Sequence, residues 1–398
     1  MTTPVDIFIS GGGIAGLVAA AAFGRAGFSV CLADPAPPVD TAEAEGSDLR
    51  STAYLQPARD LLETAGLWDT LAPHATPLDA LRVIDTAGWP PEPTATREFR
   101  ADELGELPFG WNLPNWLTRK VLADHIASLD RVDLRLGVGF KSLLQRETAA
   151  LITLTDGTRL SAKLAIAADG RASPLREAAG IGVTTTRYGQ KALAFSVTHP
   201  HPHGNISTEI YNAGGAFTLV PLPDHQGGPA SAVVWMNDGP RAAELMAMAP
   251  PKFEAEMTAR STALLGHLTL ASPRRMWPVI TQRATRLAAQ RVAITAEAAH
   301  VLPPIGAQGL NTSLNDIAAL LQIATAAPGE IGAGNILSAY EKNRTRDIKA
   351  RAAVIDLFNR ICRSDTAAIQ ALRTRGLKAV YDITPVRRAV MQAGLGPG

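Results

Sequence analysis

The first 34 residues place a glycine-rich turn between an apolar strand and an alanine-rich helix. Residues 5–10 are apolar enough for a buried strand, and residues 17–25 are expected to form a helix. The turn between them reads Gly-Gly-Gly-Ile-Ala-Gly over residues 11–16, and the next strand, residues 29–33, ends in Asp34. A strand, a G-x-G-x-x-G turn, a helix and an acidic residue in this order predict a βαβ unit that binds a dinucleotide.

Each position of this turn has its own expected role. Gly11 makes the tight turn, Gly13 admits a pyrophosphate, and Gly16 lets the helix approach the strand closely. The helix start holds the phosphates with its free N–H groups, and Asp34 accepts hydrogen bonds from the adenosine ribose. The predicted dinucleotide contacts are therefore Gly11, Gly13, Ile14, Ala15, Gly16 and Asp34.

A second glycine-containing segment lies between residues 292 and 316. An expected strand at residues 292–295 leads to a carboxylate, a histidine, two prolines and two glycines, and a helix is expected to open near Leu310. The glycines let backbone lie against a flat ring, and the helix start directs its positive end toward the ring edge. This order predicts a flavin seat formed by Glu297, His300, Pro303, Pro304, Gly306, Gly309, Leu310 and Asn311.

A third motif follows the apolar strand expected at residues 165–169. Asp169, Gly170, Ser173 and Arg176 match the D-G-x-x-S-x-x-R motif, and the chain thereby resembles flavoprotein aromatic hydroxylases of the para-hydroxybenzoate hydroxylase type. The segment from residue 297 to 311 is similar to the third motif of that family. The departure is Ala296-Glu297, where the family usually has Gly-Asp, and it puts the contact with the ribityl chain in doubt.

Further stretches resemble the ubiquinone-biosynthesis hydroxylases (UbiH/UbiF type) within this family, so that the similarity spans essentially the whole chain. Residues 47–53 resemble the D-x-R-x-x-A segment of that subgroup, and residues 112–119 resemble the stretch with its second cofactor-binding arginine. Tyr340, Arg344 and Asp347 keep the spacing of its C-terminal helix. The resemblance implies that Arg50 and Arg119 bind the cofactor, as do Asp169, Gly170 and Arg176.

The fold implied is α/β: a Rossmann-like FAD-binding domain of the glutathione-reductase type, with an inserted antiparallel β-sheet substrate domain and a C-terminal helical region. Strands of the inserted sheet are expected at residues 191–199, 207–222 and 231–237. The expected division is 1–72, 100–182 and 276–350 for the discontinuous FAD-binding domain, 73–99 and 183–275 for the substrate domain, and 351–398 for the C-terminal helices.

The resemblance implies an FAD-dependent monooxygenase in which NAD(P)H docks transiently as the reductant, because only one G-x-G-x-x-G is present. It implies hydroxylation of an aromatic ring through a C4a-hydroperoxyflavin, with a prenylated phenol of ubiquinone biosynthesis as the first expected substrate. Pro303, Pro304 and His300 are the flavin-face candidates for catalysis. Two alternatives remain open: hydroxylation of a small soluble aromatic, and a catalytically idle flavin-fold accessory subunit of quinone biosynthesis. The residue that deprotonates the phenol is not identified by these motifs.

Composition restricts the partners. Lys+Arg 38 against Asp+Glu 37 gives a net charge of +1, which offers no general field for nucleic acid. His199, His201 and His203 alternate with prolines and adjoin no Cys or acidic ligand, so no metal site is predicted. Outside the glycine-rich first helix no uncharged apolar run is long enough to span a bilayer, and no signal peptide is expected, which indicates a cytoplasmic protein.

The C-terminal segment, residues 373–398, combines basic and apolar side chains. Its basic residues are Arg373, Arg375, Lys378, Arg387 and Arg388 against Asp382 alone, and they alternate with Leu377, Val380, Val386, Val390, Met391 and Leu395. Such a segment can lie on an anionic membrane. We therefore expect peripheral contact with the inner face of the membrane and association with other ubiquinone-biosynthesis proteins. The alternative is a helix that packs back on the FAD-binding domain with its arginines in water.

Overall fold

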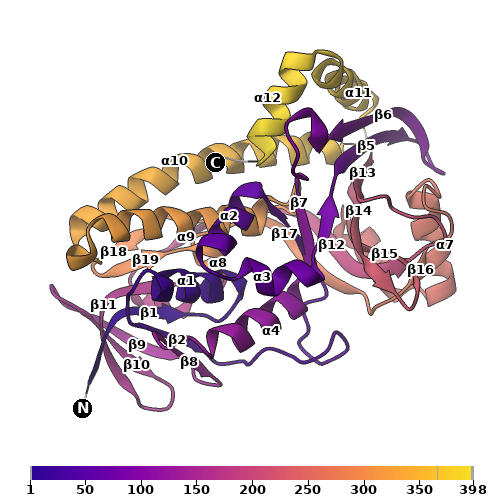
Figure 1. The fold of residues 1–398 in the computed structure, drawn as a ribbon. Coiled ribbons are helices and arrows are strands. Elements are labelled where there is room, and N and C mark those ends of the chain that lie inside the picture. The colour runs from indigo at the N-terminus through magenta and orange to yellow at the C-terminus, as the bar shows by residue number, and fades with distance from the viewer. Residues whose placement is uncertain (1, 365, 396–398) are drawn as a thin grey trace.

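The computed structural model describes residues 2–364 and 366–395, and two large sheets organise it (Figure 1). The first sheet has the order β18-β19-β11-β1-β2-β8, and β9 and β10 extend it beside β11. Its strands are β1 (Thr3–Ser10), β2 (Val30–Asp34), β8 (Val132–Leu136), β9 (Phe140–Gln145), β10 (Ala150–Leu154), β11 (Arg159–Ala167), β18 (Ala288–Ala289) and β19 (Val292–Ile294). The central strand β1 pairs in parallel with both β2 and β11, as the βαβ prediction requires.

Helices and a small three-stranded sheet surround the first sheet. The helices are α1 (Ile14–Arg25), α2 (Gln56–Thr64), α3 (Trp68–Leu71), α4 (Asn115–Ile126), α5 (Pro174–Ala178), α8 (Ala296–Ala299) and α9 (Gln308–Ala326). The small sheet contains β3 (Ser51–Leu55), β7 (Gly110–Pro114) and β4 (Thr76–Leu78). Three short 3-10 turns occupy Ala72–His74, Ala101–Glu103 and Pro328–Glu330.

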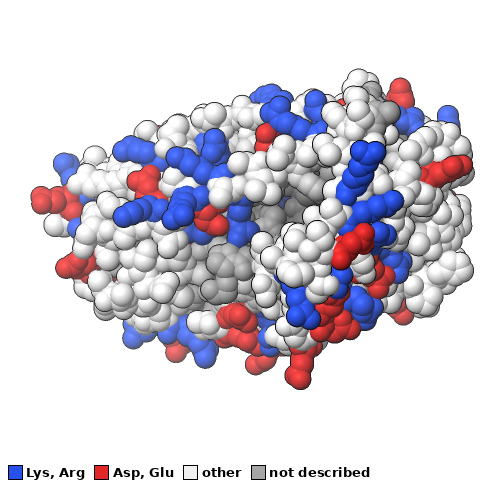
Figure 2. All heavy atoms as spheres, turned by 90° about the horizontal axis from the view of Figure 1, so that it is seen from above, with Lys and Arg blue, Asp and Glu red and all other residues white. Residues whose placement is uncertain are grey.

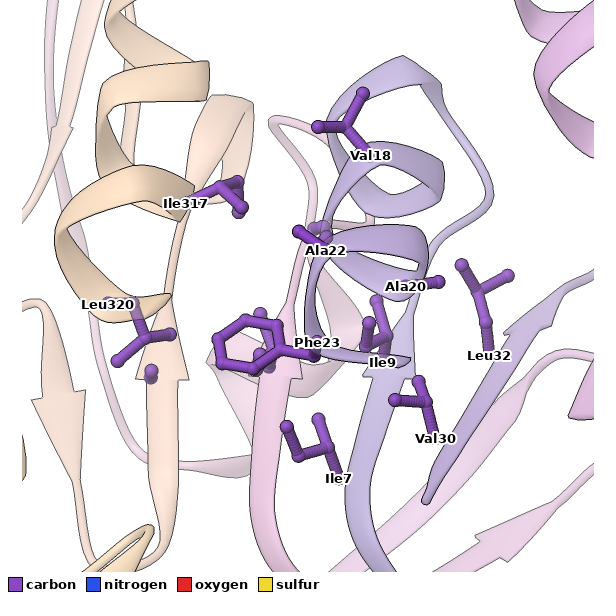
Figure 3. Packing of buried hydrophobic residues seen from close by; sticks show 14 of the residues in the cluster. Ile7, Ile9, Val18, Ala20, Ala22, Phe23, Val30, Leu32, Ile317 and Leu320 are labelled. Atoms are coloured by element: carbon purple, nitrogen blue, oxygen red, sulfur yellow. The ribbon is translucent and has the colours of Figure 1, made fainter. Parts of the chain in front are cut away.

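Helix α1 is buried between this sheet and α9 (Figure 3). Phe23 of α1 lies beside Leu320 of α9, while Ile7 and Ile9 of β1 form the layer beneath it, and all four side chains are fully buried. Burial of a side chain of this size stabilises the fold by about 1.5–3 kcal/mol. The alanines of α1 let the helix approach strand and helix alike, so its N-terminus is held rigidly over the end of β1.

The second sheet has the order β20-β17-β12-β15-β14-β13-β5-β6, with β16 beside β12. Its strands are β5 (Ala80–Ala87), β6 (Glu92–Arg100), β12 (Val183–Thr198), β13 (Ile206–Asn212), β14 (Gly215–His225), β15 (Gly228–Asp238), β16 (Thr269–Leu270), β17 (Arg275–Ala284) and β20 (His300–Val301). Pairing is antiparallel except between β5 and β13. One face packs on α6 (Gly239–Ala247) and α7 (Pro250–Arg260), and the other meets Leu302 and Ile305.

Several expected boundaries differ from the structure. The strand expected at 207–222 is two strands, β13 and β14, because Gly214 and Gly215 take φ values of 88° and 136° and close a hairpin. Helix α9 begins at Gln308, two residues before the expected opening at Leu310. Strand β17 pairs with β12 of the second sheet, although residues 276–350 were assigned to the FAD-binding part.

The chain ends in α10 (Gly334–Arg363), α11 (Ala367–Asp382) and α12 (Thr384–Leu395), which lie above both sheets in Figure 1. Part of the expected membrane segment packs back on the second sheet: Leu377, Val380 and Met391 join its apolar cluster. Arg373 is buried and pairs with the buried Asp85 of β5 at 2.5 Å. The last three residues of the expected segment lie outside the described residues.

The remaining basic residues of this segment divide between the protein and the surface. Arg387 pairs with Glu103 at 2.8 Å, so it also faces the protein. Arg375, Lys378 and Arg388 are exposed. The segment therefore packs mainly on the inserted sheet, where the packed-back alternative placed it on the FAD-binding domain, and Arg375, Lys378 and Arg388 remain exposed.

We predict that Arg373→Met destabilises the protein by about 3–5 kcal/mol, because it leaves the buried Asp85 carboxylate without its cation. Chemical denaturation followed by circular dichroism measures the change. Arg375→Met on the same helix is the matched control, since Arg375 is exposed, and it should change stability by less than about 0.5 kcal/mol. Equal stability of the two variants would contradict the prediction.

Candidate cofactor and active site

The three glycines of the first turn differ in what surrounds them. Gly11 has φ +108°, and a Cβ there would lie 2.4 Å from the Ala168 carbonyl oxygen. A Cβ on Gly16 would lie 1.9 Å from the Gly11 carbonyl oxygen, whereas a Cβ on Gly13 would meet nothing within 4 Å. The fold itself therefore requires Gly11 and Gly16, while the space at Gly13 is left open to a ligand.

Asp34 and Arg119 fix the backbone of this turn. The Gly12 N–H donates to Asp34 Oδ2 at 2.6 Å, and Arg119 Nε donates to the Gly12 carbonyl at 2.7 Å. The Arg119 guanidinium also lies 3.3 Å from Asp34 Oδ1. Helix α1, which opens with Ile14 and Ala15, has no side-chain cap, so its first N–H groups keep their capacity for an anion.

Asp169 follows β11 next to the glycine turn, at the carboxyl end of a strand parallel to β1. Its Oδ2 accepts hydrogen bonds from Ser10 Oγ at 2.9 Å and from the Leu175 N–H at 3.1 Å. Its Oδ1 is buried and has no partner among the described residues. Burial raises the pKa of this carboxyl, against the hydrogen bonds that lower it. A buried acceptor without a donor, next to an open glycine turn, fits a ligand group.

Arg176 of the same motif contacts main chain. Its Nη1 donates to the carbonyls of Arg171 and Ala298, both at 3.0 Å, and the side chain is buried. Ser173 caps α5 by accepting from the Arg176 N–H at 3.0 Å, and Gly170 takes φ +82° in the turn before it. These contacts join α5 to α8, so any effect of the guanidinium on the cofactor passes through the backbone it holds.

The departure from the family motif lies at the start of α8. Ala296 takes φ +54°, a left-handed conformation, and its N–H donates to Asp316 Oδ2 at 3.0 Å. Glu297 points outward and is exposed. Burial lowers the pKa of Arg50. The Asp48 and Glu297 carboxylates raise it by more, so this pKa lies above its ordinary value. Glu297 is thus close enough to Arg50 to act on its charge.

Arg50 lies where the two sheets meet. Its Nε donates to Asp48 Oδ1 at 2.8 Å, and its guanidinium lies 5.2 Å from the centre of the Trp277 ring on β17. It is partly exposed, which leaves it accessible to a ligand. This contact places Trp277 beside Arg50, one of the predicted cofactor residues.

His300 is fully buried, and its Nε2 bonds to Asp316 Oδ2 at 2.7 Å. Asp316 also accepts from Arg344 Nε at 2.8 Å, and Arg344 pairs with Asp347 at 3.0 Å. The histidine is therefore part of a buried ion network, and this geometry favours a positioning role over contact with reacting atoms. Its Nδ1 has no partner among the described residues.

The loop before α9 carries the other predicted flavin-face residues. Pro303 is buried, Pro304 and Gly306 are exposed, and Gly309 and Leu310 are half-buried at the helix start. Asn311 is buried and holds β3: its Nδ2 donates to the Ala53 carbonyl at 2.7 Å, and its Oδ1 accepts from the Leu55 N–H at 2.9 Å. The start of α9 has no side-chain cap, so it too presents free N–H groups.

Motif matching missed Asp316, although it connects most of these residues. It is a fully buried carboxylate on α9, between the buried Leu314 and Ile317. An acidic residue on the apolar face of a helix was the available signal, because such a position requires a partner inside the protein.

The geometry fits a dinucleotide carrying a flavin: an open glycine position, two uncapped helix starts and an unpartnered carboxylate oxygen lie along the motif strands. The sequence model of the FAD-binding domain family matches residues 4–354. The chain belongs to the FAD-binding domain family. The predicted α/β fold with its helical C-terminus is confirmed by this match and by the solved structures that it resembles.

Similar proteins cover nearly the whole chain. It is 31% identical to ubiquinone hydroxylase UbiL of Rhodospirillum rubrum, over 98% of this chain and 89% of the relative. It is 27% identical to 3-demethoxyubiquinol 3-hydroxylase of Escherichia coli, over 99% of each chain. The crystal structure of p-nitrophenol 4-monooxygenase PnpA from Pseudomonas putida superposes with a TM-score of 0.81, at 19% identity and over 99% of each chain.

This family member is an FAD-dependent monooxygenase, with FAD as its cofactor and NAD(P)H as its reductant. When bound, FAD supplies the redox chemistry. We propose that the turn at Gly13, the Asp34–Arg119 pair, Asp169 and the start of α9 hold it. Among the described residues no group of His, Cys, Asp and Glu side chains could hold a metal ion, and no helix is long and apolar enough to cross a membrane.

Gly13→Val should yield a folded protein that purifies without FAD. The protein has room for the side chain, so the change removes only the space expected for the pyrophosphate. Absorbance near the flavin maximum and far-UV circular dichroism test this. Gly105→Val is the matched control, because that glycine is exposed and also open, and it should stay yellow. Stoichiometric FAD in the Gly13 variant would refute the assignment.

Asp169→Ala should weaken FAD binding or slow flavin reduction by at least about tenfold, since a charged hydrogen bond is worth about 1.5–3 kcal/mol. Titration of the apoprotein with FAD and stopped-flow reduction by NAD(P)H measure the two effects. Asp133→Ala on β8 of the same sheet is the control, because its carboxylate is exposed and pairs with Arg135. Wild-type affinity together with a wild-type reduction rate would disprove the role.

Proposed function

We propose that this protein hydroxylates the aromatic ring of a prenylated phenol on the way to ubiquinone, with FAD, NAD(P)H and O2. The observation that carries the proposal is the similarity over nearly full length to the two bacterial hydroxylases named above and, at 25% identity, to the mouse ubiquinone biosynthesis monooxygenase COQ6, mitochondrial. The intact motif geometry supports an active flavoenzyme over an idle accessory subunit.

The C-terminal helices support a lipid-soluble substrate. Of α10 and α11, five large apolar residues are exposed: Val354, Leu357, Phe358, Ile369 and Leu372. Leu357 and Phe358 of α10 lie three and four residues after Val354, and Leu372 of α11 lies three residues after Ile369. The exposed apolar residues of each helix therefore share one side of it. Ile383, Val386 and Val390 are exposed on and just before α12.

Basic side chains accompany this apolar surface. Arg360, Arg363, Arg375, Lys378 and Arg388 are exposed on the same three helices. Figure 2 views the molecule from above, the side along which α10 runs, and shows Lys and Arg side chains gathered there. Exposed apolar groups together with cations suit the surface of an anionic membrane. We propose that this surface holds the enzyme at the membrane where its substrate lies.

Point substitutions test the membrane surface better than truncation does, because removal of residues 373–398 would also remove the buried Arg373 and Met391. Leu357→Glu combined with Leu372→Glu should reduce flotation with phosphatidylglycerol vesicles about tenfold or more, since each leucine contributes roughly 1 kcal/mol or more of apolar burial. Turnover of a long-chain prenylphenol presented in vesicles should fall in parallel, while turnover of a short, water-soluble prenylphenol should persist.

The matched control introduces the same charges elsewhere. Leu144→Glu combined with Val183→Glu changes two exposed apolar residues outside the C-terminal helices and should leave vesicle binding unchanged. Unaltered binding in the C-terminal variant would reject the membrane surface. Failure of the wild-type protein to add one oxygen atom to any prenylphenol, measured by mass spectrometry, would reject the proposed reaction.

A further inference from the structure

Strand β13 presents a carboxylate and a phenol side by side. Glu209 and Tyr211 are two residues apart, so their side chains lie on the same face of the sheet. The Tyr211 hydroxyl donates a hydrogen bond to Glu209 Oε2. The pair therefore forms one polar unit in the middle of a strand that is flanked by β5 and β14.

This face of the sheet meets the loop that leads to the predicted flavin seat. Tyr211 belongs to the same apolar cluster as Leu302 and Ile305, which flank Pro303 and Pro304. Only part of the Glu209 surface is accessible, and this burial raises the pKa of Glu209, against hydrogen bonds from Tyr211 and the Gly306 main chain, which lower it. Glu209 thus lies next to Gly306, one of the residues expected beside the ring.

Stabilisation of the fold does not account for a carboxylate at position 209. Its partners among the described residues are a hydroxyl and a main-chain N–H group, and neither supplies a full positive charge. The neighbouring Arg373 is bonded to Asp85, so its charge is already matched. A carboxylate buried without a cation costs free energy, and such groups gather at functional sites.

Resting on the proposed function, we propose that Glu209 binds the phenol hydroxyl of the substrate beside the Gly306 loop and removes its proton as the ring is hydroxylated. The O–H bond breaks, its electron pair moves into the ring and makes the ring carbon nucleophilic, and the proton stays on the carboxylate until solvent takes it. The ring carbon then forms a bond to one oxygen atom of O2 and loses its hydrogen as a proton, while the other oxygen atom leaves as water and NAD(P)H supplies the two electrons. Tyr211 is a positioning residue that orients the carboxylate.

Glu209→Gln tests the role with little change in shape. With purified FAD-loaded enzyme and 2-geranylphenol, NAD(P)H oxidation should stay within about twofold. Hydroxylated product per NAD(P)H should fall about a hundredfold, the usual scale of general-base catalysis, with hydrogen peroxide in its place. Glu98→Gln is the matched control, because Glu98 is a half-buried carboxylate on β6 of the same sheet that pairs with Arg82. It should keep wild-type coupling.

The dependence of product yield on pH distinguishes a Glu209 that accepts a proton from one that is only structural. Product yield in the wild type should fall as the pH drops through the raised pKa of Glu209, because the protonated carboxyl cannot accept a proton. The glutamine variant should lack this fall in yield. Tyr211→Phe removes a hydrogen bond that lowers this pKa, so the fall in yield should move to higher pH. Other titratable or charged groups near the pair are Cys362 of α10, Arg373 of α11, Asp85 of β5, and Arg260 of α7, which donates to the carbonyl of Ile210 between the two residues.

Wild-type coupling in Glu209→Gln, or an unmoved profile in Tyr211→Phe, would overturn the inference. Absence of product from the wild-type enzyme with any phenol would instead count against the proposed function. If the glutamine variant fails to fold, the profile of the Tyr211→Phe variant decides the question.

Discussion

The arrangement of the whole site depends on the carboxylate of Asp316. It accepts hydrogen bonds from the Ala296 N–H, from His300 and from Arg344, which belong to α8, β20 and α10. Burial raises the pKa of Asp316, but His300 and Arg344 outweigh it and lower that pKa below its ordinary value. The network therefore stabilises the fold at any pH above about 3.9, the pKa of an unfolded aspartate, and weakens only below it. Since α8 follows the first sheet and β20 pairs with the second, this one side chain fixes the seam between them.

The same carboxylate explains how the chain accommodates its departure from the family motif. Ala296 occupies a left-handed conformation that glycine adopts without cost, and an L residue there costs about 1–2 kcal/mol. Its N–H group is bonded to Asp316, so the backbone is held in that conformation by a buried charge. Glu297, in place of aspartate, is exposed beside the charged group around Arg50, where a longer side chain meets no steric limit.

Sequence motifs predicted the features that depend on residues close together in the chain. The β1–α1–β2 unit, the turn glycines and the resemblance to flavin hydroxylases all follow from spacing within about 30 residues, because the backbone of a tight turn restricts which residues it can contain. Motifs could not predict pairs formed by tertiary folding: Arg373 and Asp85 are 288 residues apart, and Glu209 of β13 meets Gly306 in the loop before α9. The hairpin at Gly214 and Gly215 was missed because apolar residues continue through both strands.

The polar side chains around the predicted cofactor site divide by what they contact. Arg176, Asn311 and Arg119 bond to carbonyl groups, and Asp316 bonds to a backbone N–H and to the buried His300 and Arg344. These side chains shape the main chain that surrounds the cofactor, and most of their hydrogen-bonding capacity is already used. On our proposal, specificity for a substrate comes from groups outside this frame, such as Glu209, which faces the motif loop from the inserted sheet. This explains how one cofactor-binding frame serves different aromatic substrates: the frame is held by its own backbone contacts, so residues of β13 and its neighbours can change without disturbing it.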